Sequence, residues 1–157
     1  MFREVARKKQ ALDRAACVEI LKTAKRGVLA VTGAEGYPYA VPLNHYYNEE
    51  DGCLYFHSGK TGHKTEALAK NAKVSFCVTD DGESAGDWSY YFKSVIVFGE
   101  VEMIEDRDEI YRISRLLSLK FTSDEEYIAH EIAHSGPATA MFRLRPAHIT
   151  GKRVHER

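Results

Sequence analysis

The sequence predicts a mainly β protein with flanking helices, in which about six strands form a small antiparallel barrel. Two observations favour this class over a doubly wound sheet. The strand-like segments are short and rich in β-branched or aromatic residues. Most of them follow one another through tight turns, which leaves no room for βαβ units. A chain of 157 residues, 44% of them hydrophobic, can form one core, so we expect a single domain over residues 1–157.

The first helix is expected at residues 13–24. Asp13 is suited to cap it, because a short acidic side chain can accept from the first free amides of a helix. Apolar residues then recur at the spacing of a surface helix, at Cys17, Ile20, Leu21 and Ala24. Three strand-like segments follow, at residues 27–33, 37–48 and 53–58. The turn signals between them, Glu35-Gly36 and Asp51-Gly52, predict antiparallel pairing.

The remaining elements have equally local signals. We expect a helix ending near Asn71, a strand at 73–80, a polar loop at 81–89, a long strand at 91–105 and a last strand at 139–152. Gly99 lies inside the long strand, where a glycine is typical of a bulge or bend. Asp106 with Glu109, and Ser123 with Glu126, have the spacing of capping signals for two further helices.

Charge and composition exclude several classes of partner. Lys and Arg total 22 against 23 Asp and Glu, so we expect no binding to nucleic acid or to an anionic membrane surface. The longest apolar runs are far shorter than the roughly 20 residues that span a bilayer. The three cysteines are widely spaced and form no C-x-x-C pair, which is typical of a reducing compartment. We therefore expect a cytoplasmic protein.

Residues 56–68, FHSGKTGHKTEAL, contain a candidate anion site. The segment is not a Walker A loop, because His63 separates the second glycine from Lys64. The first amides of the helix are nevertheless free donors at the positive end of its dipole. Lys64, His63 and Ser58 could add donors to a phosphate held there. From this stretch alone, an ordinary solvated helix start is the favoured interpretation.

A second motif, His130 to His134, has the form H-E-x-x-H, which places two histidines on one helix face. A zinc protease needs a third ligand, and Pro137 and Ala140 occupy the downstream positions at which a metzincin has a glycine and a histidine. We therefore expect no metal site beyond adventitious binding. The tyrosine-rich segments at 44–48 and 88–92 are expected to cover a core edge or a subunit interface, with the interface favoured.

Five segments carry a resemblance that spans nearly the whole chain. They are EGYPYAVPLNHYY, LYFHSGKTGHKTEAL, NAKVSFCV, YYFKSVIVFGEVEMIED and HITGK, at 35–47, 54–68, 71–78, 90–106 and 148–152. In this order they resemble the pyridoxamine 5′-phosphate oxidase-like superfamily of FMN-binding split barrels, and more narrowly its nitroimidazole reductase group. The resemblance implies a six-stranded split barrel and a homodimer that holds a flavin, FMN or FAD, at its interface.

The resemblance also implies site residues. Val41, Pro42, Leu43 and Asn44 would lie along the isoalloxazine ring and give it backbone hydrogen bonds. His57 and Ser58 would lie beside the ribityl chain, with His63 and Lys64 at the phosphate. Ser94 would reach the flavin from the other subunit, and Lys152 on the last strand is a further candidate.

The implied activity is that of a flavin-dependent oxidoreductase. Pyridoxamine-phosphate oxidases carry an arginine where Val41 stands and a C-terminal segment rich in Arg and Trp, whereas this chain ends GKRVHER, so that activity is not expected. The nitroimidazole reductase group implies a small-molecule acceptor such as a nitroaromatic compound, with NAD(P)H or another reductant as donor. His45, Tyr46 and the aromatic residues near Trp88 could form the acceptor pocket, and no residue is assigned as a catalytic acid or base. A flavin-storing or flavin-sensing module and a heme-binding split barrel are the alternatives.

Overall fold

The computed structural model describes residues 1–155, so the last two residues of the C-terminal GKRVHER segment lie outside it. The strands are β1 (Arg26–Thr32), β2 (Pro38–Asn44), β3 (Tyr46–Asn48), β4 (Cys53–Gly59), β5 (Lys73–Thr79), β6 (Glu83–Ser84), β7 (Tyr90–Ile104) and β8 (Thr139–His155). The α-helices are α1 (Arg14–Thr23), α2 (His63–Lys70), α3 (Arg107–Ser118) and α4 (Glu125–Ser135). Single 3₁₀ turns occur at Lys8–Gln10, Ala34–Gly36 and Gly136–Ala138.

The strands form one curled antiparallel sheet, in the order β2-β1-β5-β7-β8-β4-β3, with β6 paired to β7. This confirms the predicted class, a mainly β protein consistent with a split barrel. The prediction of six strands is too low for two reasons. The expected strand 37–48 is divided at His45 into β2 and β3, which lie at opposite ends of the sheet. The expected loop 81–89 also contains the two-residue strand β6.

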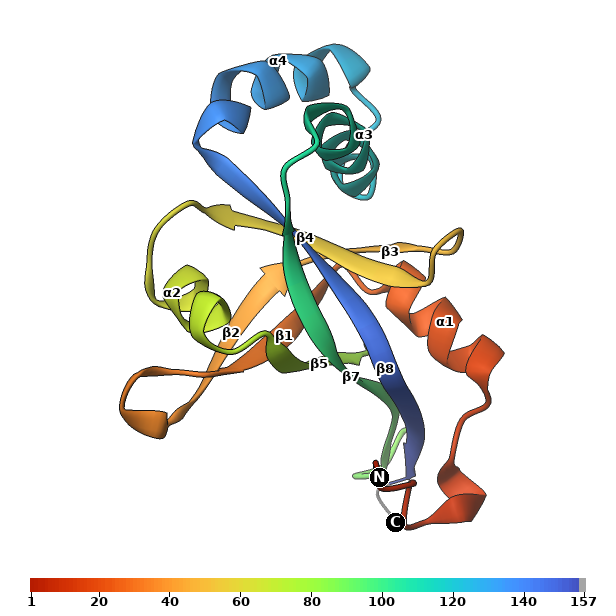
Figure 1. The fold of residues 1–157 in the computed structure, drawn as a ribbon. Helices are drawn as coiled ribbons and strands as arrows, with labels where there is room; N and C mark the ends of the chain where they lie inside the picture. Colours follow the sequence, from red (N-terminus) through yellow and green to blue (C-terminus); the bar gives the residue numbers. More distant parts are fainter. Residues whose placement is uncertain (156–157) are drawn as a thin grey trace.

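The two longest strands, β7 and β8, run side by side through the molecule (Figure 1). Their register shifts between Phe98, paired to His148, and Gly99, paired to Pro146, so Ala147 is the extra residue of a bulge. A Cβ at Gly99 would lie 2.1 Å from the carbonyl oxygen of Arg145. The predicted irregularity at Gly99 is therefore confirmed, and close backbone approach explains why the position needs glycine.

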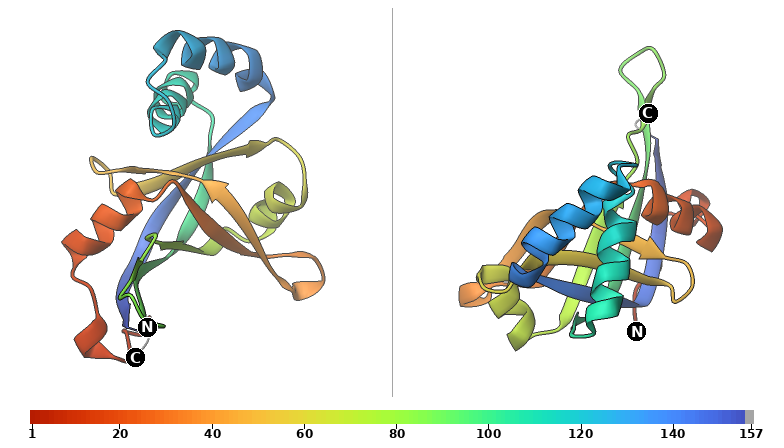
Figure 2. Two further views of the ribbon diagram at one scale, coloured as in Figure 1. Left: turned by 180° about the vertical axis from the view of Figure 1, so that it is seen from behind. Right: turned by 90° about the horizontal axis from the view of Figure 1, so that it is seen from above.

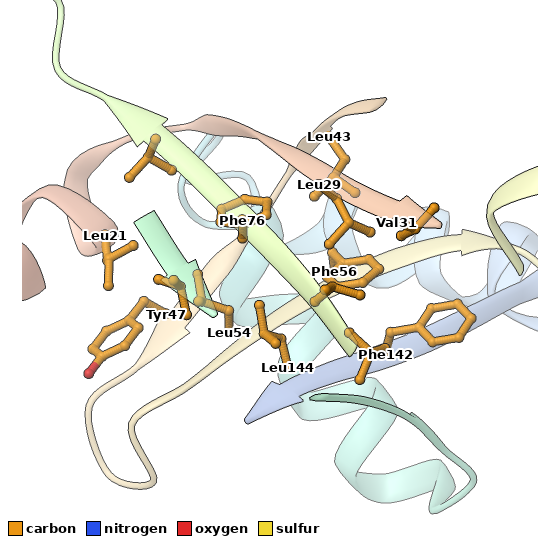
Figure 3. Packing of buried hydrophobic residues seen from close by; sticks show 14 of the residues in the cluster. Leu21, Leu29, Val31, Leu43, Tyr47, Leu54, Phe56, Phe76, Phe142 and Leu144 are labelled. Atoms are coloured by element: carbon orange, nitrogen blue, oxygen red, sulfur yellow. The ribbon is translucent and has the colours of Figure 1, made fainter. Parts of the chain in front are cut away.

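The main core lies inside the curled sheet, where side chains from α1, α2 and seven strands converge (Figure 3). The labelled members are Leu21 of α1, Leu29 and Val31 of β1, Leu43 of β2, Tyr47 of β3, Leu54 and Phe56 of β4, Phe76 of β5, and Phe142 and Leu144 of β8. A smaller cluster lies on the other face of β4 and β8. There Tyr55 and Met141 pack with Ile113 of α3.

The helices cover separate parts of this sheet (Figures 1 and 2). Helix α1 lies along β8, α2 follows the end of β4, and the α3–α4 hairpin sits over the smaller cluster. Asp13 and Asp106 cap α1 and α3 as predicted. The cap of α4 was wrongly assigned to Ser123, because Asp124 is the residue whose side chain accepts from the amide of Tyr127, at 2.9 Å. Both types of side chain can accept from these amides, so spacing alone does not separate two adjacent candidates.

Candidate functional site

Strand β2 offers a row of backbone groups that no other strand uses. It ends the sheet order, and the amide of Gly33 donates to the carbonyl of Tyr37 at 2.8 Å, so residue 37 points its backbone groups toward β1. Backbone direction alternates along a strand, so Pro42 and Asn44 direct theirs to the free edge. Proline suits this edge because it has no N–H to pair. The edge thus presents the carbonyl of Pro42 and both backbone groups of Asn44.

The side chains of the same strand divide between the two faces. Leu43 is buried in the core, and Val41 packs against it. Pro42 is exposed on the outside, and the side-chain oxygen of Asn44 accepts from Nε of Arg26 at 3.0 Å. Of the four predicted ring contacts, Pro42 and Asn44 therefore have backbone groups on the free edge, whereas Val41 and Leu43 have theirs toward β1.

Helix α2 differs from the other three α-helices of residues 1–155 in having no side-chain cap. Its N-cap is Gly62, at φ 124°, and a Cβ there would meet nothing within 4 Å, so the space in front of the first amides is open. The hydroxyl of Thr65 donates to the carbonyl of Gly59 at 3.0 Å, which holds this first turn against the end of β4 beside Ser58. Lys64 is half-buried here, and burial lowers its pKa. A bound anion would compensate for the hydration that the Lys64 ammonium group loses on burial.

His63 is already engaged within the chain. Its Nε2 accepts from the backbone amide of Ala34 at 3.0 Å, and its ring stacks on Tyr39 at 4.1 Å. These contacts fix the β1–β2 turn to the start of α2. A phosphate contact by His63 would therefore have to use Nδ1, because Nε2 is not available as a donor.

His57 and Ser58 follow each other on β4, so their side chains point to opposite faces. Ser58 points to the side of the main core, whereas His57 opens into a cavity of about 280 Å³ under the α3–α4 hairpin. Partial loss of solvent lowers the pKa of His57, and the charge of nearby Lys64 lowers it further. The charge of Lys64 on α2 therefore acts on His57, although the two residues belong to different elements.

Ser94 and Lys152 lie on the outer face of the sheet, where they are cross-strand partners in β7 and β8. Both line a shallow hollow of about 410 Å³ whose other wall is the N-terminal segment 3–7. Val28 and Ile96 expose 39% and 38% of their surface, respectively, on the same side. The structure therefore groups these two predicted residues with each other, apart from the α2 start and the β2 edge.

His45 was predicted to line an acceptor pocket, and this is wrong. Its side chain is fully buried, with Nε2 donating to the carbonyl of Leu21 at 2.8 Å. Burial and the neighbouring charge of Lys120 lower the pKa of His45 to about 4. Lys120 itself donates to the carbonyls of Ala24 and His45, at 2.7 and 2.6 Å, and burial lowers its pKa to about 8. No local pattern in the sequence indicates this polar cluster, because its members are up to 96 residues apart.

The H-E-x-x-H motif lies on α4 with its two rings stacked 6.3 Å apart. Within residues 1–155, no group of three or more His, Cys, Asp or Glu side chains is arranged to hold a metal ion. Among the same residues, no helix has the length and apolar character needed to cross a membrane.

A family model for pyridoxamine 5′-phosphate oxidase matches residues 13–153. The chain belongs to the pyridoxamine 5′-phosphate oxidase-like family. A protein of Bacteroides thetaiotaomicron, described as a candidate 5-nitroimidazole antibiotic resistance protein, has a similar structure, with a TM-score of 0.76 and 25% identity over 92% of this chain and 87% of the other. An FAD-binding protein of Mesorhizobium loti has a TM-score of 0.67 and 24% identity over 92% and 97% of the two chains. No curated protein sequence matches the chain.

Residues around β2, β4 and α2 supply the kinds of group that a flavin requires. A phosphate needs donors, which the open start of α2, Lys64 and the hydroxyl of Ser58 provide. The pyrimidine edge of the ring carries both donors and acceptors, which the free edge of β2 can pair. The donor set around β2, β4 and α2 therefore fits a flavin phosphate and ring.

Proposed function

We propose that the protein is a flavin-dependent oxidoreductase that reduces small aromatic acceptors, nitroaromatic compounds among them. The observation that carries the proposal is the uncapped start of α2, which Thr65 ties to the end of β4 and at which Lys64 is half-buried. Within residues 1–155, three helices have an aspartate that accepts from one amide of the first turn, and α2 has no such cap and carries Lys64 instead. This arrangement is suited to a phosphate.

The family supports the flavin, and the Bacteroides neighbour supports the class of acceptor. When bound, the flavin would supply the hydride or electrons for reduction. The chain's own residues would fix the cofactor. Lys64 and Ser58 would bind the phosphate, and the backbone of Pro42 and Asn44 would orient the ring. Binding of the phosphate would thus keep the ring positioned at the free edge of β2.

We place the cofactor at the interface of a homodimer. The outer sheet face of one protomer carries Ser94 and Lys152 beside the exposed apolar residues Val28 and Ile96. Apolar surface of this kind is stabilised when a second protein surface covers it. The chain also contains a single tryptophan, Trp88, which is 74% exposed in the loop before β7. These features support a dimer in which β2 and α2 of one protomer hold the flavin and the other protomer contributes Ser94 to the same site.

The phosphate site is tested by Lys64→Ala in a binding titration of FMN against riboflavin. A charge-assisted hydrogen bond contributes about 1.5–3 kcal/mol, so FMN affinity should fall about 10- to 100-fold while riboflavin affinity stays the same. Lys60→Ala is the matched control, because Lys60 is an exposed lysine in the loop just before α2. Equal FMN affinity in wild type and Lys64→Ala would place the phosphate elsewhere.

The activity is tested anaerobically with NAD(P)H and a nitroimidazole. Loss of the nitro absorbance, with cycling of the flavin band, is the expected result. Binding of flavin without any loss of the nitro absorbance would support a storing or sensing module instead. A Soret band in the purified protein, with no flavin, would point to heme and overturn the proposal.

A further inference from the structure

The cavity under the α3–α4 hairpin is not used by the function proposed above. It measures about 280 Å³, just below the roughly 300–1,000 Å³ typical of ligand sites, so it suits part of a cofactor better than a whole one. Its lining is mixed. Ser114 and Ser118 of α3 and Glu131 of α4 supply polar groups, and Ile110 and Ile132 supply apolar walls.

His57 connects this cavity to the start of α2. His57 lines the cavity together with Thr139, which pairs with Gly59 at the end of β4. Thr65 holds the first turn of α2 to the last residue of β4, only two residues beyond His57. A cofactor whose phosphate lies at Lys64 can therefore extend past the end of β4 into the cavity.

We propose that the cavity under the α3–α4 hairpin binds the adenosine half of FAD, so that FAD and not FMN is the cofactor that fits this protein best. The inference rests on the proposed flavin site, since it extends the phosphate held there to a diphosphate. It assigns His57 and Lys64 to the two sides of that diphosphate.

The chemistry of the lining matches a nucleoside. A glutamate accepts hydrogen bonds from ribose hydroxyls, as acidic residues do in dinucleotide sites, and serine hydroxyls can accept or donate there. Isoleucine side chains cover an adenine face by burying its apolar area. Glu131 is the only carboxylate in the lining, and it would repel the diphosphate if it were beside it. On this proposal Glu131 faces the ribose, and His57 lies nearer the phosphates.

An electron acceptor is a less suitable occupant of this cavity. An acceptor must stack on the flavin ring, which in the proposed site lies along β2. The cavity is on the face of β4 opposite Ser58, under the helices, so an acceptor bound there would be separated from the ring by the strand.

The test is a calorimetric titration of apoprotein with FAD, FMN and riboflavin, which needs no turnover. We expect FAD to bind at least about tenfold more tightly than FMN, the gain from one or two additional hydrogen bonds and the buried adenine. Glu131→Gln should remove part of this difference, and Ser114→Phe, which fills the cavity, should remove all of it. FMN affinity should not change in either variant.

Two control variants separate a cavity effect from a general one. Glu126→Gln changes an exposed carboxylate on the same helix, and Ser123→Phe adds the same bulk in the exposed loop before it. Both should keep the wild-type preference for FAD. Thermal unfolding of each variant checks that the α3–α4 hairpin is intact.

Each outcome decides between the two proposals. Tight FMN binding with no preference for FAD overturns this inference and leaves the flavin site standing. An equal loss of FMN affinity and FAD affinity in Glu131→Gln, with the fold intact, also overturns it, because the carboxylate would then act on the half that both cofactors share. Failure to bind any of the three compounds overturns the proposed function and this inference together.

Discussion

The buried His45 makes a sharp prediction about stability in acid. Its ring is completely buried, packs edge-on against Phe76 at 5.0 Å, and donates from Nε2 to the carbonyl of Leu21. Its Nδ1 is buried without a partner among the described residues, so a second proton would enter an apolar environment near Lys120. Burial first, and the Lys120 charge second, lower the pKa of His45 from 6.5 to about 4.

The magnitude follows from linkage. Because the folded pKa lies below the unfolded value of 6.5, the unfolded chain binds more protons between pH 6.5 and pH 4. The contribution of His45 to stability is therefore fully present above pH 6.5 and is lost as the pH falls toward 4. At 1.36 kcal/mol per pH unit, the loss is about 3 kcal/mol. This is a large fraction of the roughly 5–15 kcal/mol that holds a typical domain folded.

The assay is urea unfolding at several pH values from 4 to 7.5, in wild type and in His45→Phe. Carboxylates titrate in both proteins, so the quantity of interest is the difference between the two slopes. We expect wild type to lose about 3 kcal/mol more than His45→Phe over this range. The control is His134→Gln, which removes an exposed histidine of α4 and should keep the wild-type slope. Parallel curves for wild type and His45→Phe would refute the assignment of His45 as the neutral buried group.

Three further predictions concern other groups. Lys120→Met should flatten a rise in stability between pH 8 and 10.5, because Lys120 loses its proton earlier when folded, and a pH series of unfolding curves measures this. Gly99→Ala should cost about 3 kcal/mol or more, read from the unfolding midpoint, because its Cβ would lie 2.1 Å from the carbonyl oxygen of Arg145. FAD affinity should decrease as the pH rises through the range in which His57 loses its proton, because a bound diphosphate favours the protonated form of His57, whose pKa burial lowers in the free protein. His57→Gln should remove this pH dependence, and riboflavin, which has no phosphate, should not show it.

Much of the fold follows from local sequence. The strands were predicted from β-branched and aromatic runs, α1 from its apolar spacing, and the bulge from a glycine inside a long strand. The division at His45 could not be predicted in this way. The segment 37–48 has the composition of one continuous strand, but tertiary contacts divide it. The His45 side chain turns inward to the carbonyl of Leu21, and Lys120 donates to the backbone carbonyl of His45. These partners are 24 and 75 residues away.

The candidate site also has features that local sequence predicts and features that depend on distant contacts. The open start of α2 was foreseeable, because Gly62 cannot cap it with a side chain. The alternation of His57 and Ser58 also follows from strand geometry, but the sequence does not say what covers each face. The engagement of His63 with Ala34 depends on a contact between residues 29 positions apart, and no motif indicates it. For this reason a double substitution of His63 and Lys64 would mix phosphate binding with the integrity of the β1–β2 turn, and substitution of Lys64 alone is the better probe.

The two faces of β4 explain how one strand could distinguish two cofactors. A strand presents consecutive residues to opposite sides, so Ser58 and His57 can serve two different spaces without a change in the backbone. FMN would need only the side with Ser58, the β2 edge and the start of α2. FAD would need both sides, joined by a diphosphate around the end of β4 next to Lys64. It follows that filling the cavity at Ser114 should convert a protein that prefers FAD into one that treats both cofactors equally, with no change in the residues that hold the ring.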